Sequence, residues 1–189
     1  MNNMEKILAF NKQFVDSKQY ESYRTSRYPN RKMVILTCMD TRLQELLTRA
    51  MNLQNGDAKV IRNAGAIVTQ PFGNVMRSIL VAVYELNAEE ICVIGHYDCG
   101  MTGLNPEKLM QKMRQSGIDH ETFDILKNSG IHLSAWLKGF DNIEESVKNS
   151  VSIIHRHPLL PKNLPVHGLI IHPETGKLDW IVNGYEQAK

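Results

Sequence analysis

The sequence lacks the features that mark exported and membrane-spanning proteins. None of its apolar runs approaches the roughly 20 residues that a membrane-spanning helix needs. Its first residues, "MNNMEKILAF", show no apolar core followed by a small-residue cleavage site. Its three cysteines, an odd number in a chain without an export signal, argue against a disulfide framework. These absences predict a cytoplasmic protein with no membrane partner, in which cysteine serves metal or thiol chemistry.

A strong excess of one charge and the usual nucleotide-binding motifs are also missing. The formal net charge is only +2, which is too small to indicate a nucleic-acid partner. The stretch "RNAGA" (62–66) has neither the Lys-Ser/Thr pair of a P-loop nor a G-x-G-x-x-G pattern. We interpret its small residues as allowing the backbone to approach a metal pocket or a partner chain. Without a repeat or a linker, residues 1–189 are expected to form one domain.

Short apolar runs alternate with helical patterns along the chain. Strands are predicted at 33–39, 58–62 and 89–97, with helices at 4–20, at 42–51 and from Pro71 to about Leu86. Helical pieces follow between 100 and about 157, one of them starting at Pro106, and a strand hairpin spans 168–184 around the turn "ETGK". Strands separated by helices predict an α/β fold: a mainly parallel sheet flanked by helices, with an antiparallel edge strand near the carboxyl terminus.

Chemically reactive side chains follow three of the predicted strands. Cys38 ends the first strand, the stretch 62–65 ends the second, and His96 and Cys99 follow the third. In open α/β sheets, ligands bind beyond the carboxyl ends of the strands. We therefore expect these three stretches to meet at one edge of the sheet.

Cys38, His96 and Cys99 form a Cys₂His set that suits Zn²⁺. Three protein ligands leave one tetrahedral position open for water, as in catalytic sites, whereas structural zinc usually takes four. Two thiolates offset the charge of the ion. We therefore expect the pKa of a zinc-bound water to lie above the ~7 of a three-histidine site.

Asp40 and Arg42 stand beside the first cysteine. Two residues apart in an extended stretch, they are predicted to point the same way. A bidentate pair would lower the pKa of the Asp40 carboxyl and aim its free oxygen. Such an oxygen can accept a proton from zinc-bound water.

The remaining cysteine and histidines receive structural interpretations. Cys92 lies inside the strand pattern "ICVIG" and is predicted to serve packing. His155 and His157 are assigned to the end of a helix, where a positive imidazole suits the helix dipole. The four other histidines are left as surface or packing residues: His120, His132, His167 and His172.

The motifs "CMDTR" (38–42), "RNAGA" (62–66) and "GHYDCG" (95–100), in this order, resemble those of a β-class carbonic anhydrase of the compact prokaryotic branch. The resemblance implies that Cys38, His96 and Cys99 bind zinc and that Asp40 and Arg42 form a catalytic dyad. It implies reversible hydration of carbon dioxide to bicarbonate and a proton, by attack of zinc-bound hydroxide. It also implies a homodimer or homotetramer, with the amino-terminal helix (1–20) packed on a second subunit.

Some members of that family close the site by binding the aspartate to zinc as a fourth ligand. Those members also carry a bicarbonate-binding Trp shortly before the first cysteine, where this chain has "MVILT" (33–37). Their inhibitory bicarbonate site is therefore not expected here. The sequence does not decide whether Asp40 by itself binds zinc and closes the site. Two alternatives also stay open: a hydrolase of carbonyl sulfide or carbon disulfide with the same ligands, and a non-enzymatic zinc or thiol protein.

Overall fold

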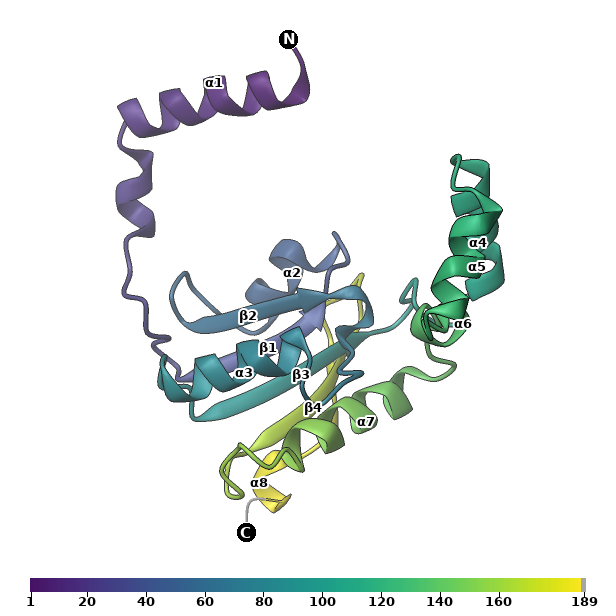
Figure 1. Ribbon diagram of the computed structural model, residues 1–189. Helices are drawn as coiled ribbons and strands as arrows, with labels where there is room; N and C mark the ends of the chain where they lie inside the picture. The colour runs from purple at the N-terminus through teal and green to yellow at the C-terminus, as the bar shows by residue number, and fades with distance from the viewer. Residues whose placement is uncertain (188–189) are drawn as a thin grey trace.

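A five-stranded sheet forms the centre of the computed structural model, which describes residues 1–187 (Figure 1). The strands lie in the order β2-β1-β3-β4-β5. Strands β2, β1, β3 and β4 are parallel to one another, and β5 runs antiparallel to β4 at the edge. Their bounds are Met33–Cys38 (β1), Ala58–Asn63 (β2), Glu90–His96 (β3), Val166–Ile171 (β4) and Leu178–Val182 (β5). The predicted α/β fold with an antiparallel edge is confirmed.

The two central strands are apolar on both faces because helices cover both sides of the sheet. Alternate residues of β1 point in opposite directions, so Val34 and Leu36 enter one core cluster and Ile35 enters the other. The first cluster contains buried residues of α3 (Asn74–Tyr84) and α7 (Ile143–His155). The second contains residues of α2 (Leu43–Ala50). The sheet edge that carries the candidate site is thus fixed from both faces.

Two predictions about proline and the helix starts had different outcomes. Pro106 occupies the first turn of α4 as predicted. The predicted start at Pro71 is wrong, because Pro71 lies in a turn and α3 begins at Asn74 after Gly73. The remaining helices are α4 (Pro106–Gln115), α5 (His120–Asn128), α6 (Leu133–Trp136) and α8 (Gly184–Gln187).

The first helix, α1 (Asn3–Asp16), stands away from the sheet (Figure 1). A capping box between Asn2 and Glu5 starts it. The predicted single helix over 4–20 is wrong at its end, because Lys18 adopts a left-handed conformation and a short 3₁₀ helix, η1 (Gln19–Tyr23), follows. None of the residues of α1 is buried in this chain. Phe14 is half-buried near Tyr23, and five other apolar side chains of α1 are at least half exposed: Met4, Ile7, Leu8, Phe10 and Val15.

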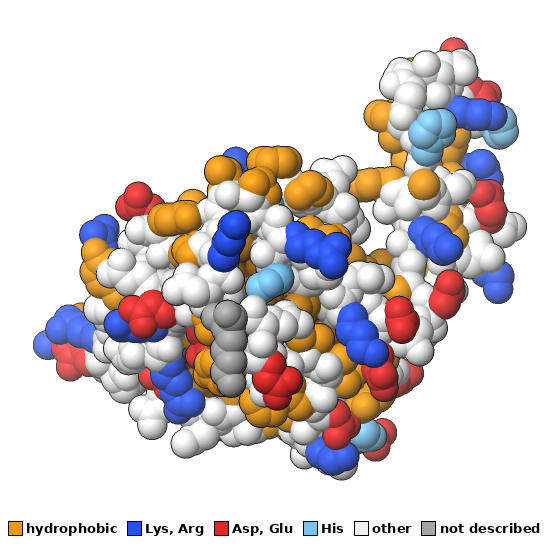
Figure 2. Space-filling model, turned by 90° about the horizontal axis from the view of Figure 1, so that it is seen from below, with side chains coloured by type: hydrophobic (Ala, Val, Ile, Leu, Met, Phe, Trp, Pro, Cys, Tyr) orange, Lys and Arg blue, Asp and Glu red, His pale blue; other side chains and the backbone are white. Residues whose placement is uncertain are grey.

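A second projection, formed by α4, α5 and α6, extends from the domain beyond the carboxyl end of β3 (Figure 1). The segments that precede α4 and follow α6 pair with each other through a bridge between Thr102 and Phe140. Side chains of both charge signs are interspersed on the face shown in Figure 2, in keeping with the small net charge. Within residues 1–187, no helix combines the length and the apolar character needed to cross a membrane.

Candidate metal centre

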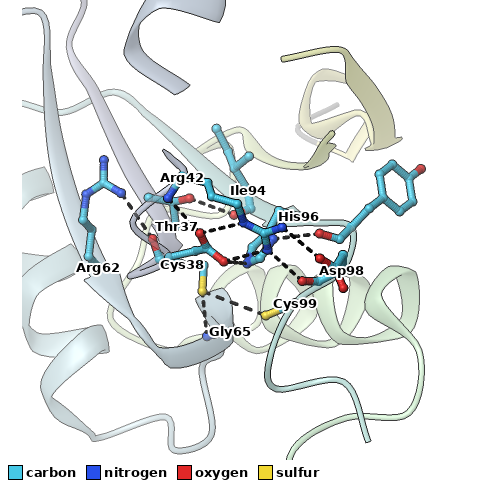
Figure 3. Close-up of polar contacts among 11 residues, drawn as sticks. Thr37, Cys38, Arg42, Arg62, Gly65, Ile94, His96, Asp98 and Cys99 are labelled. Carbon is cyan, nitrogen blue, oxygen red and sulfur yellow. Dashed lines mark hydrogen bonds and ion pairs between the residues drawn. The ribbon is translucent and has the colours of Figure 1, made fainter. Parts of the chain in front are cut away.

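Cys38, His96 and Cys99 meet at the carboxyl edge of the sheet, as predicted (Figure 3). One potential ligand atom from each lies within 4.8 Å of the others, and all three residues are buried. The two sulfur atoms are 3.9 Å apart. Cys38 is the last residue of β1 and His96 the last of β3, so neighbouring parallel strands fix two of the three positions.

His96 presents one ring nitrogen to the sulfur atoms. Its Nδ1 lies 2.9 Å from the carbonyl oxygen of Tyr97. Because a carbonyl only accepts hydrogen bonds, Nδ1 carries a proton. The other nitrogen, Nε2, is buried and has no hydrogen-bond partner among the described residues. An unpartnered buried polar atom is costly, so Nε2 fits a site that is completed by a metal ion.

The surroundings of His96 attract positive charge. Burial alone lowers the pKa of His96, but the Cys38 sulfur, the Tyr97 carbonyl and the Asp40 carboxylate together raise it. Groups that draw a proton to this nitrogen draw a cation in the same way. The donor set of two sulfurs and one imidazole therefore suits Zn²⁺ in charge as well as in ligand type.

The two cysteines share one proton between their sulfur atoms. The Cys99 thiol, hydrogen bonded to Cys38, is the largest influence that lowers the pKa of Cys38, to about 4, and the Gly65 amide adds to it. The same contact raises the pKa of Cys99. Close sulfurs of this kind release their remaining proton when a metal ion takes its place.

A tight loop brings the Gly65 amide to the site, as the small residues of "RNAGA" predicted. The Asn63 side chain accepts from the Ile67 amide at 3.1 Å and donates to the Ile67 carbonyl at 2.7 Å. Gly65 has φ 82° and donates its N–H to the Cys38 sulfur at 3.3 Å. A Cβ atom at Gly65 would lie 2.9 Å from the Ile67 side chain, so the sequence needs glycine there.

Asp40 and Arg42 pair, but for a different reason from the one predicted. The chain turns after β1 instead of continuing extended, and Asp40 Oδ1 accepts the backbone N–H of Arg42 at 2.9 Å. The guanidinium adds two bonds, Nε to Oδ1 at 3.1 Å and Nη2 to Oδ2 at 2.9 Å. Arg42 thereby lowers the pKa of Asp40 to about 2. Asp40 Oδ2 lies 3.8 Å from His96 Nε2, next to the ligand set.

Arg62 lies at this edge of the sheet, as expected for the stretch 62–65, but its contact with Cys38 and the contact of Asp98 with Arg42 were not predicted. Asp98 accepts a 2.8 Å bond from Arg42 Nη1 (Figure 3). Arg62 donates to the Cys38 carbonyl at 3.2 Å. The acid inside "HYDC" and the arginine that begins "RNAGA" were visible in the sequence. No local spacing, however, pairs residues 56 or 24 positions apart.

The residues that received structural interpretations lie outside the ligand set. Cys92 packs in the core below the site, as predicted, and burial raises the pKa of its thiol. His155 ends α7, as predicted, whereas His157 lies beyond the helix and contacts the Pro71 carbonyl at 2.7 Å through Nε2. His167 is buried near Glu90.

The site opens into a cavity of ≈ 540 Å³. The turn from Cys38 to Arg42 forms one wall, and Ala64 and the segment 99–101 form the others. A buried ligand set beneath an accessible cavity that also exposes an acid–arginine pair is typical of a catalytic metal site.

Comparisons with known proteins find similar sequences and a similar fold. The family model described as carbonic anhydrase matches residues 33–178. The chain is 57% identical over 185 residues to YtiB of Bacillus subtilis (strain 168), which has a provisional carbonic anhydrase name; the match covers 98% of this chain and 99% of that protein. A crystal structure of β-carbonic anhydrase isoform I from Trichomonas vaginalis matches with a TM-score of 0.87 and 36% identity, covering 98% and 100% of the two chains. A carbon disulfide hydrolase of Acidithiobacillus thiooxidans is 28% identical, covering 87% and 85%.

Proposed function

Because the chain belongs to the β-carbonic anhydrase family, we propose that it catalyses the reversible hydration of carbon dioxide to bicarbonate and a proton. One observation carries the proposal. The unpartnered Nε2 of His96 faces two cysteine sulfurs, next to a carboxylate that an arginine keeps ionised. This arrangement combines a set of metal ligands with a carboxylate that can accept a proton.

Cys38, His96 and Cys99 are proposed to hold Zn²⁺. Two sulfurs and one nitrogen are ligands that zinc prefers, and three protein ligands leave one tetrahedral position for water. When bound, zinc supplies Lewis-acid chemistry that makes its water a nucleophile near neutral pH. The Gly65 amide helps to keep Cys38 in the thiolate form that a metal requires.

Asp40 and Arg42 are proposed as the catalytic dyad. With a pKa of about 2, the Asp40 carboxyl is ionised at neutral pH and can accept a hydrogen bond and then a proton. Arg42 binds both carboxylate oxygens and so fixes the orientation in which Asp40 accepts that proton. The same Oδ2 atom is close enough to the ligand set for Asp40 to fill the fourth position in a closed state, once Arg42 releases it.

The proposal includes an oligomer and a location. A homodimer or homotetramer is supported by α1, whose apolar side chains have no buried position within this chain. We expect α1 to pack on a second subunit of the single-domain protein. Three free cysteines are in keeping with a cytoplasmic location. No nucleic-acid or membrane partner is proposed.

A carbon disulfide or carbonyl sulfide hydrolase is the alternative enzyme. Its support is the relative named carbon disulfide hydrolase, which covers 87% of this chain. The alternative of a non-enzymatic zinc or thiol protein is weaker, because such a protein has no use for a bidentate acid–arginine pair beside the ligands.

Stopped-flow measurement of carbon dioxide hydration tests the proposal. Zinc-loaded protein should hydrate carbon dioxide rapidly, more so above pH 8 than at pH 7, because two thiolates weaken the acidification of a bound water. Asp40→Asn should keep its zinc and lose activity by about 10²-fold, the usual contribution of a positioned acid or base.

Carbon disulfide serves as the second substrate in the same assay. Fast release of sulfide with slow hydration of carbon dioxide would favour the alternative hydrolase. Absence of turnover of either substrate, with zinc bound, would favour the non-enzymatic protein. Full activity in Asp40→Asn would remove Asp40 from the dyad.

A further inference from the structure

Arg42 connects two carboxylates that come from different loops. It binds Asp40 in the turn after β1. It also binds Asp98 in the loop after β3, as Figure 3 shows. Asp98 contributes two acceptors: its Oδ2 lies 2.8 Å from Nη1 and its backbone carbonyl lies 2.9 Å from Nη2. Asp40 therefore binds the edge of the guanidinium formed by Nε and Nη2, and Asp98 binds the edge formed by Nη1 and Nη2.

The backbone at Asp98 is shaped for this contact. Asp98 has φ 53°, in the left-handed region that few residues other than Gly, Asn and Asp adopt. In that conformation both the carbonyl and the carboxylate of Asp98 reach Arg42. The same turn lies between His96 and Cys99, so it also separates two members of the ligand set.

The second carboxylate restricts what Arg42 can do. The Arg42 side chain is 40% exposed and has room to move. If only Asp40 held it, the acid and the arginine could swing together as one unit. With Asp98 bound to Nη1 and Nη2, Arg42 stays in place, and it keeps Asp40 Oδ2 beside His96 Nε2.

We propose that Asp98 is a positioning residue for the reaction: it anchors Arg42 from the β3 loop and thereby fixes the Asp40 carboxylate at the metal site. This inference rests on the proposed function, but the anchoring itself is a property of the chain. The carboxylate of Asp98 contacts Arg42 and is proposed to act only through it.

The exposure of Asp98 separates this role from a role in folding. Its side chain is 83% exposed, and exposed ion pairs contribute little to stability. Removing the carboxylate should therefore leave the melting temperature and the zinc content close to those of the wild type. Its effect should appear in the motion of Arg42 and in turnover.

Two substitutions preserve the left-handed backbone and differ only in the side chain. Asp98→Gly removes the carboxylate while glycine tolerates the same φ, and Asp98→Asn keeps a hydrogen-bond acceptor without the charge. Asp124→Asn is the matched control, because Asp124 is an exposed acid paired with His120 on α5, outside the site.

Hydrogen exchange of the Arg42 Nε–H, followed by NMR in zinc-loaded protein with ¹⁵N-labelled arginine, reads the anchoring without relying on activity. In the wild type this group donates to Asp40 Oδ1. We expect exchange to accelerate, and kcat for carbon dioxide to fall, by about two- to fivefold in Asp98→Gly. Asp98→Asn should be intermediate, and Asp124→Asn should match the wild type. KM should not change.

A double variant shows whether Asp98 acts through Arg42. In an Arg42→Met background, Asp98→Gly should cause no further loss of turnover. A further loss there, or unchanged exchange and kcat in Asp98→Gly, would overturn the positioning role. Faster exchange in Asp98→Gly, with a wild type that does not hydrate carbon dioxide, would uphold the anchoring and reject the proposed function.

Discussion

The candidate metal centre and α1 differ in the exposure of the side chains on which their proposed roles depend. At the metal centre the reactive side chains are nearly inaccessible: His96 is 1% exposed, and Cys38 and Cys99 are 5% exposed. Asp40 and Arg42 pair with each other beside them, and the buried Nε2 of His96 has no hydrogen-bond partner among residues 1–187. On α1 the apolar side chains face outward, with Leu8 62% exposed and Phe10 63% exposed.

The difference shows which parts of the molecule one chain can determine alone. Strand pairing, a tight glycine loop and an ion pair hold the site from several directions, so it is expected to be formed before any metal or partner binds. A helix of 14 residues is marginal on its own and gains stability mainly by burying an apolar face. The position of α1 therefore depends on a surface that this chain does not supply.

The largest expected effect comes from removing a metal ligand. Cys38→Ser should reduce bound zinc from about one ion per chain to near zero and abolish hydration, because a hard hydroxyl replaces a thiolate. The fold should persist, since the core of the sheet does not require the ion. Metal analysis, stopped-flow assay and circular dichroism check these three outcomes.

Cys92→Ala is the matched control for that variant. Cys92 is also a buried cysteine of the central strands, but it packs in the core and is not part of the ligand set. It should keep zinc and activity while lowering the melting temperature slightly. Unfolding of Cys38→Ser would contradict a preformed site and would favour a structural zinc protein.

A smaller effect is expected from the apolar face of α1. Replacing Ile7 and Leu8 together by serine should raise the dissociation constant of the oligomer by at least about tenfold, because each buried aliphatic side chain contributes roughly 1.5–3 kcal/mol. Analytical ultracentrifugation over a range of concentrations measures this constant.

Lys12→Ala is the control on the same helix, since Lys12 pairs with Asp16 on an exposed face. It should leave the association unchanged. The metal content of the Ile7/Leu8 variant should also be unchanged. An unaltered oligomer in that variant would mean that α1 does not form the subunit interface. The position of α1 would then not depend on a second subunit, and α1 would differ from the candidate metal centre only in its exposure.

The sequence allowed the ligand set to be predicted because the rule that locates it is topological. Parallel strands end at one edge, so Cys38, His96 and Cys99 could be brought together without knowing any side-chain distance. The contact of Asp98 with Arg42 could not be predicted in this way. It depends on a left-handed turn at one residue and on a guanidinium that reaches across two loops.

Local patterns also had clear limits. The pairing of Asp40 with Arg42 was predicted from an extended stretch, yet a turn with a side-chain-to-backbone bond produces it. The apolar stripe of α1 correctly predicted a helix, but its end at Asp16 is set by a left-handed residue two positions later. Periodicity thus identified the element, and neither its end nor its packing partner followed from it.

The smallest expected effect concerns the dependence of stability on pH. Arg42 lowers the pKa of Asp40 from 3.8 to about 2, so the folded state binds a proton at Asp40 less readily than the unfolded state does. The ion pair should therefore stabilise the fold fully above pH 3.8, and this contribution should be lost as the pH falls through 2. In urea titrations of chelated protein, Asp40→Asn should be less stable than the wild type at pH 6, and the difference should shrink as the pH falls through 2 and vanish below it, where the Asp40 carboxyl is protonated in the folded and the unfolded state alike. A difference that stays constant from pH 6 to pH 2 would mean that Arg42 stabilises Asp40 through shape and hydrogen bonding and not through its charge. The candidate metal centre would then be stabilised by packing and hydrogen bonds, as the core is, and the charge of Asp40 would contribute to the proposed reaction but not to the stability of the fold.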